Sequence, residues 1–464
     1  MSREALRISS MHRLLGGPLG WLLTTGPLNN LKMAMLPREF RMARARAVAV
    51  VHPDPLGLLD ALGADAAARR RLEAPAAKAL ADLASRRAAL APVQAQWDDA
   101  VWGSTPPDPA TLIALDERRR ALSEAAVKPG LLFRFLWKEA SIAPTAFDVP
   151  DPALALTRAA EWVKTPALLY GAPKAPAAVE RSAAIPGPAG PEYLIRFPSP
   201  SPFTDHDTVT ARVYEPASGG KDAPTFVYGS GLGMVYDLIR YWPEEDYMAR
   251  RLAARGVRTV LPESPWHGRR EVPGRYSGEP YLARAPVSIY ELFSAQAQET
   301  ACIVAWARAQ GARRIGVGGV SLGGLVTQQI VGHCGTWPEE MRPDMAFIGA
   351  GSGHVDQVVV MGDLSERLGI SAAVRNAGWT DGLLAQLRPL LDPPDTPAVA
   401  PEAILTYLGR RDRSTPYALA RQLLDRWQVP ERNRIVHDAD HMALYARLIR
   451  SDEAASRIAD MLAT

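Results

Sequence analysis

Ser321 lies in the pentapeptide Gly319-Val320-Ser321-Leu322-Gly323, a pattern that can make a serine hydroxyl reactive. The apolar run 315–320 before it predicts a buried strand, and the spacing of apolar residues in 322–331 predicts a helix. At such a strand-to-helix turn, small flanking residues let the hydroxyl project from the edge of a sheet. The unpaired first amides of the helix would face any anion that develops there. We therefore expect Ser321 to be a nucleophile.

A serine hydroxyl is a weak nucleophile at neutral pH, so it needs a general base and an acid that orients the base. Asp412 and His441 follow Ser321 in that order, each just beyond a predicted strand and before a predicted helix. Because parallel strands end at one edge of a sheet, the three side chains are expected to meet there. The rivals are Asp356 for the acid and, for the base, His437, His333 and His354, which we interpret as structural or pocket residues.

Acyl transfer also needs N–H donors for the negative charge that develops on the carbonyl oxygen. One is expected from the amide of Leu322, the residue after the nucleophile. The other is expected from the glycine-rich loop 229–233, which follows the predicted strand 225–228, at Ser230 or Gly231. Glycines let this backbone turn inward without steric cost. These residues form the predicted oxyanion hole.

The residues above fall in a part of the chain where predicted strands and helices alternate, which favours a mainly parallel sheet with helices on both faces. The predicted strands are 193–197, 209–214, 225–228, 257–261, 315–320, 345–348, 403–408 and 434–436. A long excess stretch, 356–397, lies between two of them. Connections of that length are uncommon unless they are functional, so we interpret it as a helical lid insertion that lines the substrate pocket. The alternative is a decorative insertion.

Residues 1–185 are predicted to form a helical N-terminal region whose segments are separated by prolines, Pro75 among them, and which carries no recognisable chemistry. A proline-rich linker at 185–202, interrupted by the 193–197 strand, leads into the second predicted domain, 186–464. The apolar segment 14–28 is too short and too interrupted to span a bilayer and lacks a cleavage site. We interpret it as a helix packed on the protein's own core, the alternative being peripheral contact with a membrane surface.

Composition excludes several other classes of function. The chain has 464 residues and a net charge of only +3, and it carries no nucleic-acid-binding motif, so no nucleic acid partner is expected. Its two cysteines, Cys302 and Cys334, cannot form a disulfide framework, which favours a reducing, cytoplasmic location. No lysine follows Lys221, so a lysine-based mechanism is excluded from the second half. No ligand spacing typical of a metal site is present, and no cofactor is expected.

The chain from about 190 to 464 resembles the α/β-hydrolase superfamily, and within it the abhydrolase-domain-containing type 18 branch. The resembling motifs are Tyr228-Gly229-Ser230-Gly231, Glu263-Ser264-Pro265-Trp266-His267-Gly268-Arg269-Arg270, 319–324 and Gly409-Arg410-Arg411-Asp412. The resemblance implies the α/β-hydrolase fold and a Ser-His-Asp triad, and little about the substrate. It departs from many esterases at Tyr228, where a histidine commonly precedes the oxyanion glycine. Residues 1–185 lie outside it.

Together these features predict a serine hydrolase that cleaves carboxylic esters through an acyl-enzyme intermediate, with a small-molecule ester as its substrate. An amidase, thioesterase or acyltransferase could use the same triad, because the shape of the pocket and the access of water to it decide what accepts the acyl group. An alternative of another class is a catalytically idle hydrolase-like module whose helical N-terminal half binds a partner. No oligomeric state is predicted.

Overall fold

The computed structural model describes residues 17, 20, 26–128, 130, 132–217, 220–360 and 362–464. The prediction made for segment 14–28 therefore falls almost entirely outside the described residues. None of the helices within the described ranges combines the length and the apolar character needed to cross a membrane.

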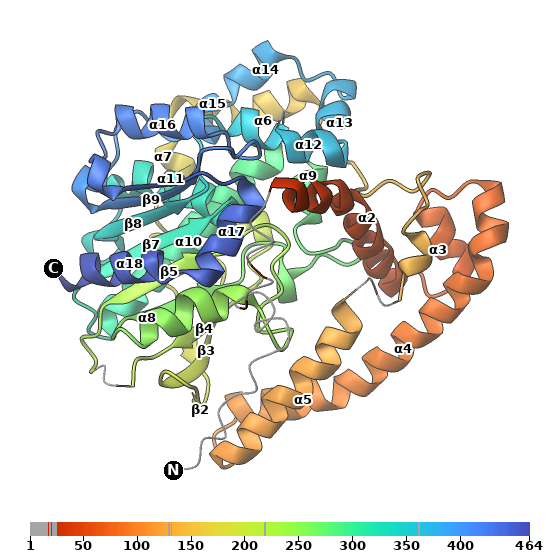
Figure 1. The fold of residues 1–464 in the computed structure, drawn as a ribbon, viewed down its shortest axis with the longest axis horizontal. Helices are drawn as coiled ribbons and strands as arrows, with labels where there is room; N and C mark the ends of the chain where they lie inside the picture. Colours follow the sequence, from red (N-terminus) through yellow and green to blue (C-terminus); the bar gives the residue numbers. More distant parts are fainter. Residues whose placement is uncertain are drawn as a thin grey trace.

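A ten-stranded sheet forms the centre of the fold (Figure 1). Neighbouring strands follow the order β1-β3-β4-β6-β5-β7-β8-β9-β10, and β2 pairs with β3. Strands β5 to β10 are parallel to one another, whereas β1 to β4 pair antiparallel. The strands are β1 (Glu180–Arg181), β2 (Ile185–Pro186), β3 (Pro191–Pro198), β4 (Thr208–Tyr214), β5 (Thr225–Gly229), β6 (Arg258–Pro262), β7 (Ile315–Val320), β8 (Met345–Gly349), β9 (Ile404–Gly409) and β10 (Arg434–His437).

The stretch 185–202 is mostly sheet and is not the linker that its prolines predicted. Strand β3 begins at Pro191 and ends at Pro198, and it pairs with β4 from Glu192 to Pro198. The prolines are tolerated because they stand at the two ends of the strand. This segment therefore extends the sheet beyond the parallel strands.

Helices cover both faces of the sheet, as the α/β alternation predicts. On β5, Val227 joins one apolar core while its neighbours Phe226 and Tyr228 join another, because successive side chains of a strand point to opposite faces. The first core includes residues of α10 and α11, and the second includes residues of α8, α17 and α18. The helices of this part are α8 (Arg251–Ala253), α9 (Glu279–Ala283), α10 (Val287–Ala309), α11 (Leu322–His333), α16 (Tyr417–Arg426), α17 (His441–Arg450) and α18 (Glu453–Ala463).

The excess stretch 356–397 forms a π-helical turn followed by four short helices. They are η9 (Asp356–Val360), α12 (Asp363–Leu368), α13 (Ile370–Asn376), α14 (Asp381–Gln386) and α15 (Arg388–Leu391). Helices α14 and α15 pack against α6 (Pro152–Lys164), and α12 packs against α2 (Gly26–Val51) (Figure 1). Trp379 strengthens this packing, since its indole N–H donates to the carbonyl oxygen of Pro150 at 2.9 Å.

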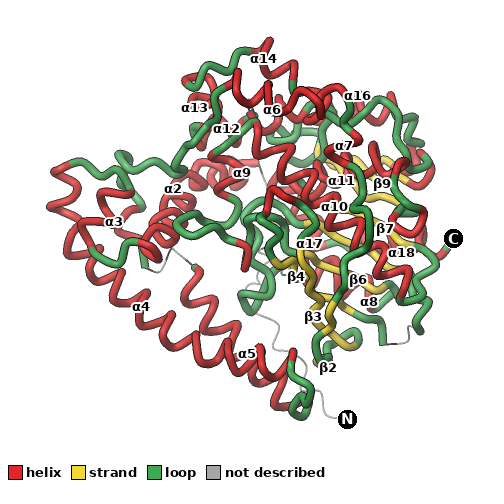
Figure 2. The backbone as a smooth tube through the Cα atoms, turned by 180° about the vertical axis from the view of Figure 1, so that it is seen from behind, coloured by secondary structure: helices red, strands yellow, loops and turns green. Residues whose placement is uncertain are grey.

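The N-terminal helices divide between the core of the sheet and an extended pair. Helices α4 and α5 lie side by side and reach well beyond the sheet (Figure 2). Helices α6 and α7, by contrast, contribute to the first apolar core through Ala155, Ala159, Leu169 and Tyr170. The helices are α2 (Gly26–Val51), α3 (Pro55–Ala61), α4 (Ala66–Trp102), α5 (Pro109–Val127), α6 (Pro152–Lys164) and α7 (Ala167–Tyr170). An aspartate caps the start of each of α3, α4, α5 and α6.

Candidate active site

Ser321 lies on the sharp turn between β7 and α11. Its backbone has φ 56° and ψ −117°, a conformation that is strained for a residue with a side chain. The flanking glycines are required by close packing. A Cβ atom at Gly319 would lie 2.4 Å from the carbonyl oxygen of Gly229, and one at Gly323 would lie 2.1 Å from the same oxygen. The turn therefore holds the serine at the carboxyl edge of the sheet.

The ring of His441 bridges Ser321 and Asp412. Its Nε2 atom lies 3.1 Å from Ser321 Oγ, and its Nδ1 atom lies 2.7 Å from Asp412 Oδ2. With a proton on Nδ1, the ring donates to the carboxylate and its Nε2 accepts from the serine hydroxyl. The structure thus brings together the three residues that chain order singled out, although 120 positions separate the serine from the histidine.

The loop after β9 fixes the Asp412 carboxylate. Its Oδ1 atom accepts hydrogen bonds from the amides of Ser414 and Thr415 at 2.8 and 2.9 Å, and Oδ2 accepts from the Thr415 hydroxyl at 2.8 Å. The residue is buried. A carboxylate held in this way sets both the tautomer and the direction of the His441 ring.

Two opposing effects act on the pKa of His441. Burial of the ring lowers this pKa, but the charge of Asp412 and the hydrogen bond to it outweigh burial, so the pKa lies above its ordinary value. The imidazolium that forms when Nε2 takes a proton is therefore stabilised. The ring is suited to act as a general base.

The other histidines considered from the sequence are engaged elsewhere. The Nε2 atom of His437 lies 3.0 Å from a carboxylate oxygen of Glu453. The ring of His333 stacks on that of Tyr170, with centroids 4.6 Å apart. Burial lowers the pKa of His333 to about 4, so this ring stays neutral. Neither histidine bonds to Ser321 among the described residues.

Asp356, the alternative acid, belongs to a different cluster. Its Oδ2 atom accepts from Nε and Nη2 of Arg388, both at 3.4 Å. Within the described ranges, the carboxylate that bonds to His441 is that of Asp412. The geometry therefore favours Asp412 over Asp356 as the orienting acid.

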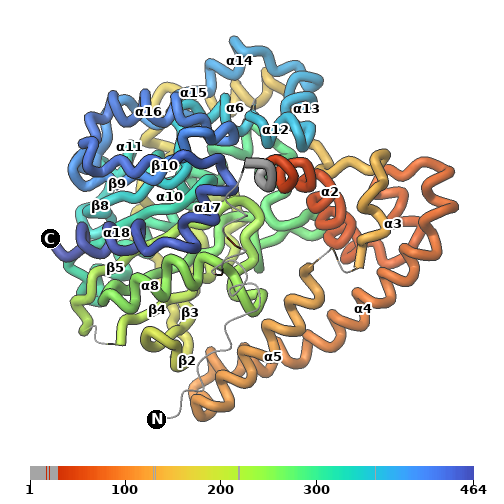
Figure 3. The backbone as a smooth tube through the Cα atoms, viewed as in Figure 1, coloured from red at the N-terminus to blue at the C-terminus, as the bar shows by residue number. Residues whose placement is uncertain are grey.

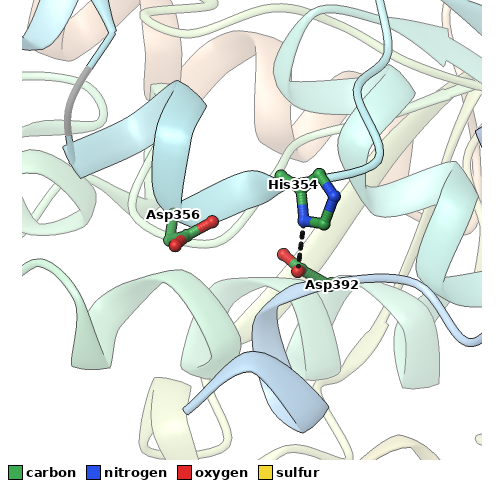
Figure 4. Close-up of side chains that lie close together, drawn as sticks. All are labelled: His354, Asp356 and Asp392. Atoms are coloured by element: carbon green, nitrogen blue, oxygen red, sulfur yellow. Dashed lines mark hydrogen bonds and ion pairs between the residues drawn. The ribbon is translucent and has the colours of Figure 1, made fainter. Parts of the chain in front are cut away.

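The cluster around Asp356 also has the spacing of metal ligands (Figure 4). Ligand atoms of His354, Asp356 and Asp392 lie within 4.8 Å of one another. Two contacts to protein atoms are present, because His354 Nδ1 lies 2.9 Å from Asp392 Oδ2 and the Arg388 guanidinium contacts Asp356 Oδ2. Asp356 Oδ1 is buried and has no hydrogen-bond partner among the described residues. Asp392 also accepts from the amide of Val355 at 2.8 Å. These contacts join the residues after β8 to the end of the 356–397 insertion.

Two backbone segments border the space beside the Ser321 hydroxyl. Leu322 is the first residue of α11, so its N–H has no acceptor within the helix, and none exists elsewhere in the described part of the chain. On the other side lies Gly231, in the loop after β5. A Cβ atom at Gly231 would lie 4.0 Å from Ser321 Cβ and 2.3 Å from the hydroxyl oxygen of Tyr445. A side chain at this position would displace the Tyr445 hydroxyl.

Ser230 holds the loop after β5 in place. Its carbonyl oxygen accepts from the Gly323 amide at 3.0 Å, and its hydroxyl donates to Glu244 Oε1 at 2.8 Å. Burial raises the pKa of the Glu244 carboxyl to about 7. Of the two loop residues predicted for the oxyanion hole, Ser230 is therefore bonded to its neighbours through its side chain and its carbonyl, whereas Gly231 lies beside Ser321.

A cavity of about 790 Å³ lies over Ser321 and His441. A volume of this size is typical of small-molecule sites. Among its lining residues, apolar side chains come from α2, from the loops that follow β5 and from α17. They include Met33, Leu36, Phe40, Leu232, Val235, Ile239, Trp242, Met442 and Ile449. The cavity can hold an apolar group next to the predicted nucleophile.

Helix α2 supplies much of the cavity wall, which the sequence analysis did not foresee. Its lining residues run from Leu31 to Arg46. Of the described residues of the 356–397 insertion, by contrast, Leu364 alone lines the cavity. Sequence reasoning also missed Glu244 and Tyr445. One signal was available for Tyr445, since it stands four residues after His441 in a predicted helix and so shares its face.

Comparison with known proteins agrees with the resemblance found in the sequence. Residues 207–351 match the family model described as "Alpha/beta hydrolase domain containing 18". This confirms the resemblance, and the sheet described above has the α/β-hydrolase fold. No curated protein sequence matches the chain.

Solved structures similar to this one include several esterases. An acetyl xylan esterase from Paenibacillus sp. R4 is 14% identical with a TM-score of 0.43, covering 68% of this chain and 96% of that chain. An S-formylglutathione hydrolase from Agrobacterium tumefaciens is 18% identical with a TM-score of 0.41, covering 61% and 99%. An esterase from Pyrococcus furiosus is 14% identical with a TM-score of 0.33, covering 62% and 91%.

Proposed function

We propose that this protein is a serine hydrolase that cleaves carboxylic esters. The observation that supports the proposal is the position of the His441 ring. Its Nε2 atom lies within hydrogen-bond distance of Ser321 Oγ, and its Nδ1 atom lies within hydrogen-bond distance of Asp412 Oδ2. In this proposal Ser321 is the nucleophile, His441 is the general base and Asp412 orients the base. The amides of Leu322 and Gly231 hold the oxyanion.

The reaction follows from these positions. Ser321 Oγ attacks the ester carbonyl carbon while its proton moves to His441 Nε2, and the carbonyl electron pair moves onto the oxygen. The tetrahedral intermediate collapses, the alcohol leaves with the proton from His441, and the acyl group stays on Ser321. A water molecule then attacks the acyl-enzyme with His441 again as base, which releases the carboxylic acid and restores the serine.

The lining of the cavity supports an ester with an apolar acyl chain. Met33, Leu36 and Phe40 of α2 face the same space as Ser321, together with Ile239 and Ile449 from other segments. Each methylene group buried there gains about 0.8 kcal/mol, which corresponds to about a fourfold increase in affinity. The cavity is large enough for several such groups.

The direct test is turnover of p-nitrophenyl esters of increasing acyl length, from acetate to palmitate. We expect kcat/KM to rise by up to about fourfold per methylene through the short chains and then to level off where the cavity is full. Acetate as the best substrate would contradict the acyl-pocket assignment. A folded protein with no turnover of any ester, and no labelling by a fluorophosphonate, would favour a hydrolase-like module without activity.

The acid limb of the pH profile is expected to report His441. The base must be neutral to take the serine proton, and its pKa is raised, so kcat/KM should fall as pH drops through that raised pKa. Measurement of kcat/KM between about pH 5 and 9 checks this. Glu244, with a pKa of about 7, titrates in the same range. The acid limb should persist in Glu244→Gln, and its disappearance in that variant would assign it to Glu244.

A further inference from the structure

We propose that the hydroxyl of Tyr445 is a further catalytic group, which donates a hydrogen bond to the oxyanion formed when Ser321 attacks the ester. This inference rests on the proposed function. It adds a side-chain donor to the two backbone amides of the oxyanion hole and assigns a role to a residue that the sequence analysis did not single out.

The helix that supplies the base also supplies this hydroxyl. Tyr445 stands four residues after His441 on α17, which places both side chains on one face of the helix. Their ring centroids lie 6.1 Å apart. The start of α17 is fixed by Asp440, whose carboxylate accepts from the amide of Ala443 at 3.1 Å. The base and the tyrosine are therefore held by one rigid element.

The hydroxyl borders the space where a carbonyl oxygen would lie. A Cβ atom placed on Gly231 would lie 2.3 Å from the hydroxyl oxygen of Tyr445 and 4.0 Å from Ser321 Cβ. Tyr445 and Ser321 both line the cavity. The tyrosine oxygen thus meets the oxyanion loop on the side that faces the nucleophile, while the Leu322 amide approaches from the start of α11.

The Tyr445 hydroxyl has no hydrogen-bond acceptor among the described residues. Within the described ranges it makes no hydrogen bond, whereas the hydroxyls of Tyr228 and Tyr247 lie 2.7 Å apart and that of Tyr276 lies 2.9 Å from the Thr145 hydroxyl. Buried tyrosine hydroxyls usually find a partner. Since this one opens onto the cavity, its partner is expected to come from the substrate.

The hydroxyl also stays protonated throughout the working pH range. Burial raises the pKa of Tyr445 well above its usual value, and the charge of the nearby Glu244 carboxyl raises it further. The group therefore acts as a neutral O–H donor. It hydrogen-bonds to the oxyanion without transferring its proton, and the only proton that moves during the attack passes from Ser321 Oγ to His441 Nε2.

The test is Tyr445→Phe, which removes one oxygen atom and keeps the ring. We expect kcat for a p-nitrophenyl ester to fall about a hundredfold, with KM changed less than about twofold, because the lost bond forms only in the transition state. The rate of inactivation by a fluorophosphonate should fall as well. Since the hydroxyl has no described protein partner, the melting temperature should not fall. Tyr281→Phe is the matched control, because Tyr281 is buried in the first apolar core and does not line the cavity.

The outcomes separate this inference from the proposed function. If Tyr445→Phe keeps kcat within about twofold of the wild type while Ser321→Ala is inactive, the role of Tyr445 is overturned and the proposed function stands. A rise in KM with unchanged kcat also overturns it, because the hydroxyl would then bind the ground state equally well. If the wild type neither turns over esters nor reacts with the probe, both ideas fail. Expressing kcat per fluorophosphonate-titrated site removes any contribution from unfolded protein.

Discussion

Ser321→Ala is expected to abolish ester turnover and covalent labelling by a fluorophosphonate while leaving the fold intact. Loss of a serine nucleophile costs on the order of a millionfold in kcat in a comparable triad enzyme. The fold should survive because, within the described ranges, the hydrogen bond of the Ser321 hydroxyl goes to His441 and not to a neighbouring strand or helix. Alanine also adopts the backbone φ of 56° about as readily as serine, so no new strain is introduced.

Two measurements on purified protein check this expectation. Labelling is followed by in-gel fluorescence, and folding by circular dichroism and the melting temperature. Ser288→Ala is the matched control, since Ser288 is a buried serine of α10 whose hydroxyl donates to the carbonyl oxygen of Tyr281 at 2.7 Å. The control should label normally. Continued labelling of Ser321→Ala would show that Ser321 is not the nucleophile, and it would contradict the proposed function.

The residues that meet at the candidate site could be predicted because each carries a local signal. Ser321 is marked by flanking glycines, whose spacing reflects the close approach of β5 to the start of α11. Asp412 and His441 each follow a recognisable strand, and parallel strands present their carboxyl ends at one edge. Pattern and topology together therefore bring these three positions into one place without knowledge of the distances.

The contribution of helix α2 to the cavity wall could not be predicted in this way. Helix α2 precedes β5 by more than a hundred residues, and nothing in its apolar pattern says which part of the fold it packs against. Helix boundaries in this region were also obscured by proline, since α2 runs through Pro37 and α4 runs through Pro75 and Pro92. A proline removes one hydrogen bond of a helix, and packing by neighbouring elements can offset that cost. The sequence shows the proline but not the packing.

The burial of charged residues could not be predicted from the sequence either. Helix α5 carries Arg119 and Arg120 next to further charged residues, a pattern typical of a solvated helix face. In the structure both arginines are buried, and both guanidinium groups contact Asp237. The partner lies 118 residues from Arg119 along the chain, so no local pattern could reveal the pair.

Asp237→Ala is expected to destabilise the protein by about 3–5 kcal/mol, the usual cost of removing one member of a buried ion pair. Arg119, Arg120 and Arg212 approach Asp237 Oδ1 at 3.2, 3.0 and 2.7 Å, and Arg269 contacts its other carboxylate oxygen. Burial alone would raise the pKa of Asp237, but these guanidiniums hold it well below its ordinary value, so the group is charged at neutral pH. Without the carboxylate, four arginines would lose a shared counter-charge in a buried site.

Urea denaturation followed by tryptophan fluorescence measures this loss, and two variants separate its causes. Asp237 has φ 64°, so part of the effect of alanine comes from the backbone; Asp205, which has φ 51° and is exposed, isolates that part. Asp205→Ala should cost no more than about 1 kcal/mol. Asp237→Asn keeps the shape and removes the charge, so it should retain most of the destabilisation. A change below about 1 kcal/mol in Asp237→Asn would show that the arginines do not depend on this carboxylate.

Removing the charge of Asp237 should also loosen the wall of the cavity, because Asp237 lies in the segment that forms part of this wall. Val235 and Ile239, two residues to either side, line the cavity, while Asp237 itself is bound to α5 through Arg119 and Arg120. The α4 and α5 pair therefore supports the cavity wall although it reaches away from the sheet (Figure 3). In Asp237→Asn we expect KM for longer acyl esters to rise at temperatures where the protein is still folded. An unchanged KM would mean that the wall keeps its shape without this anchor.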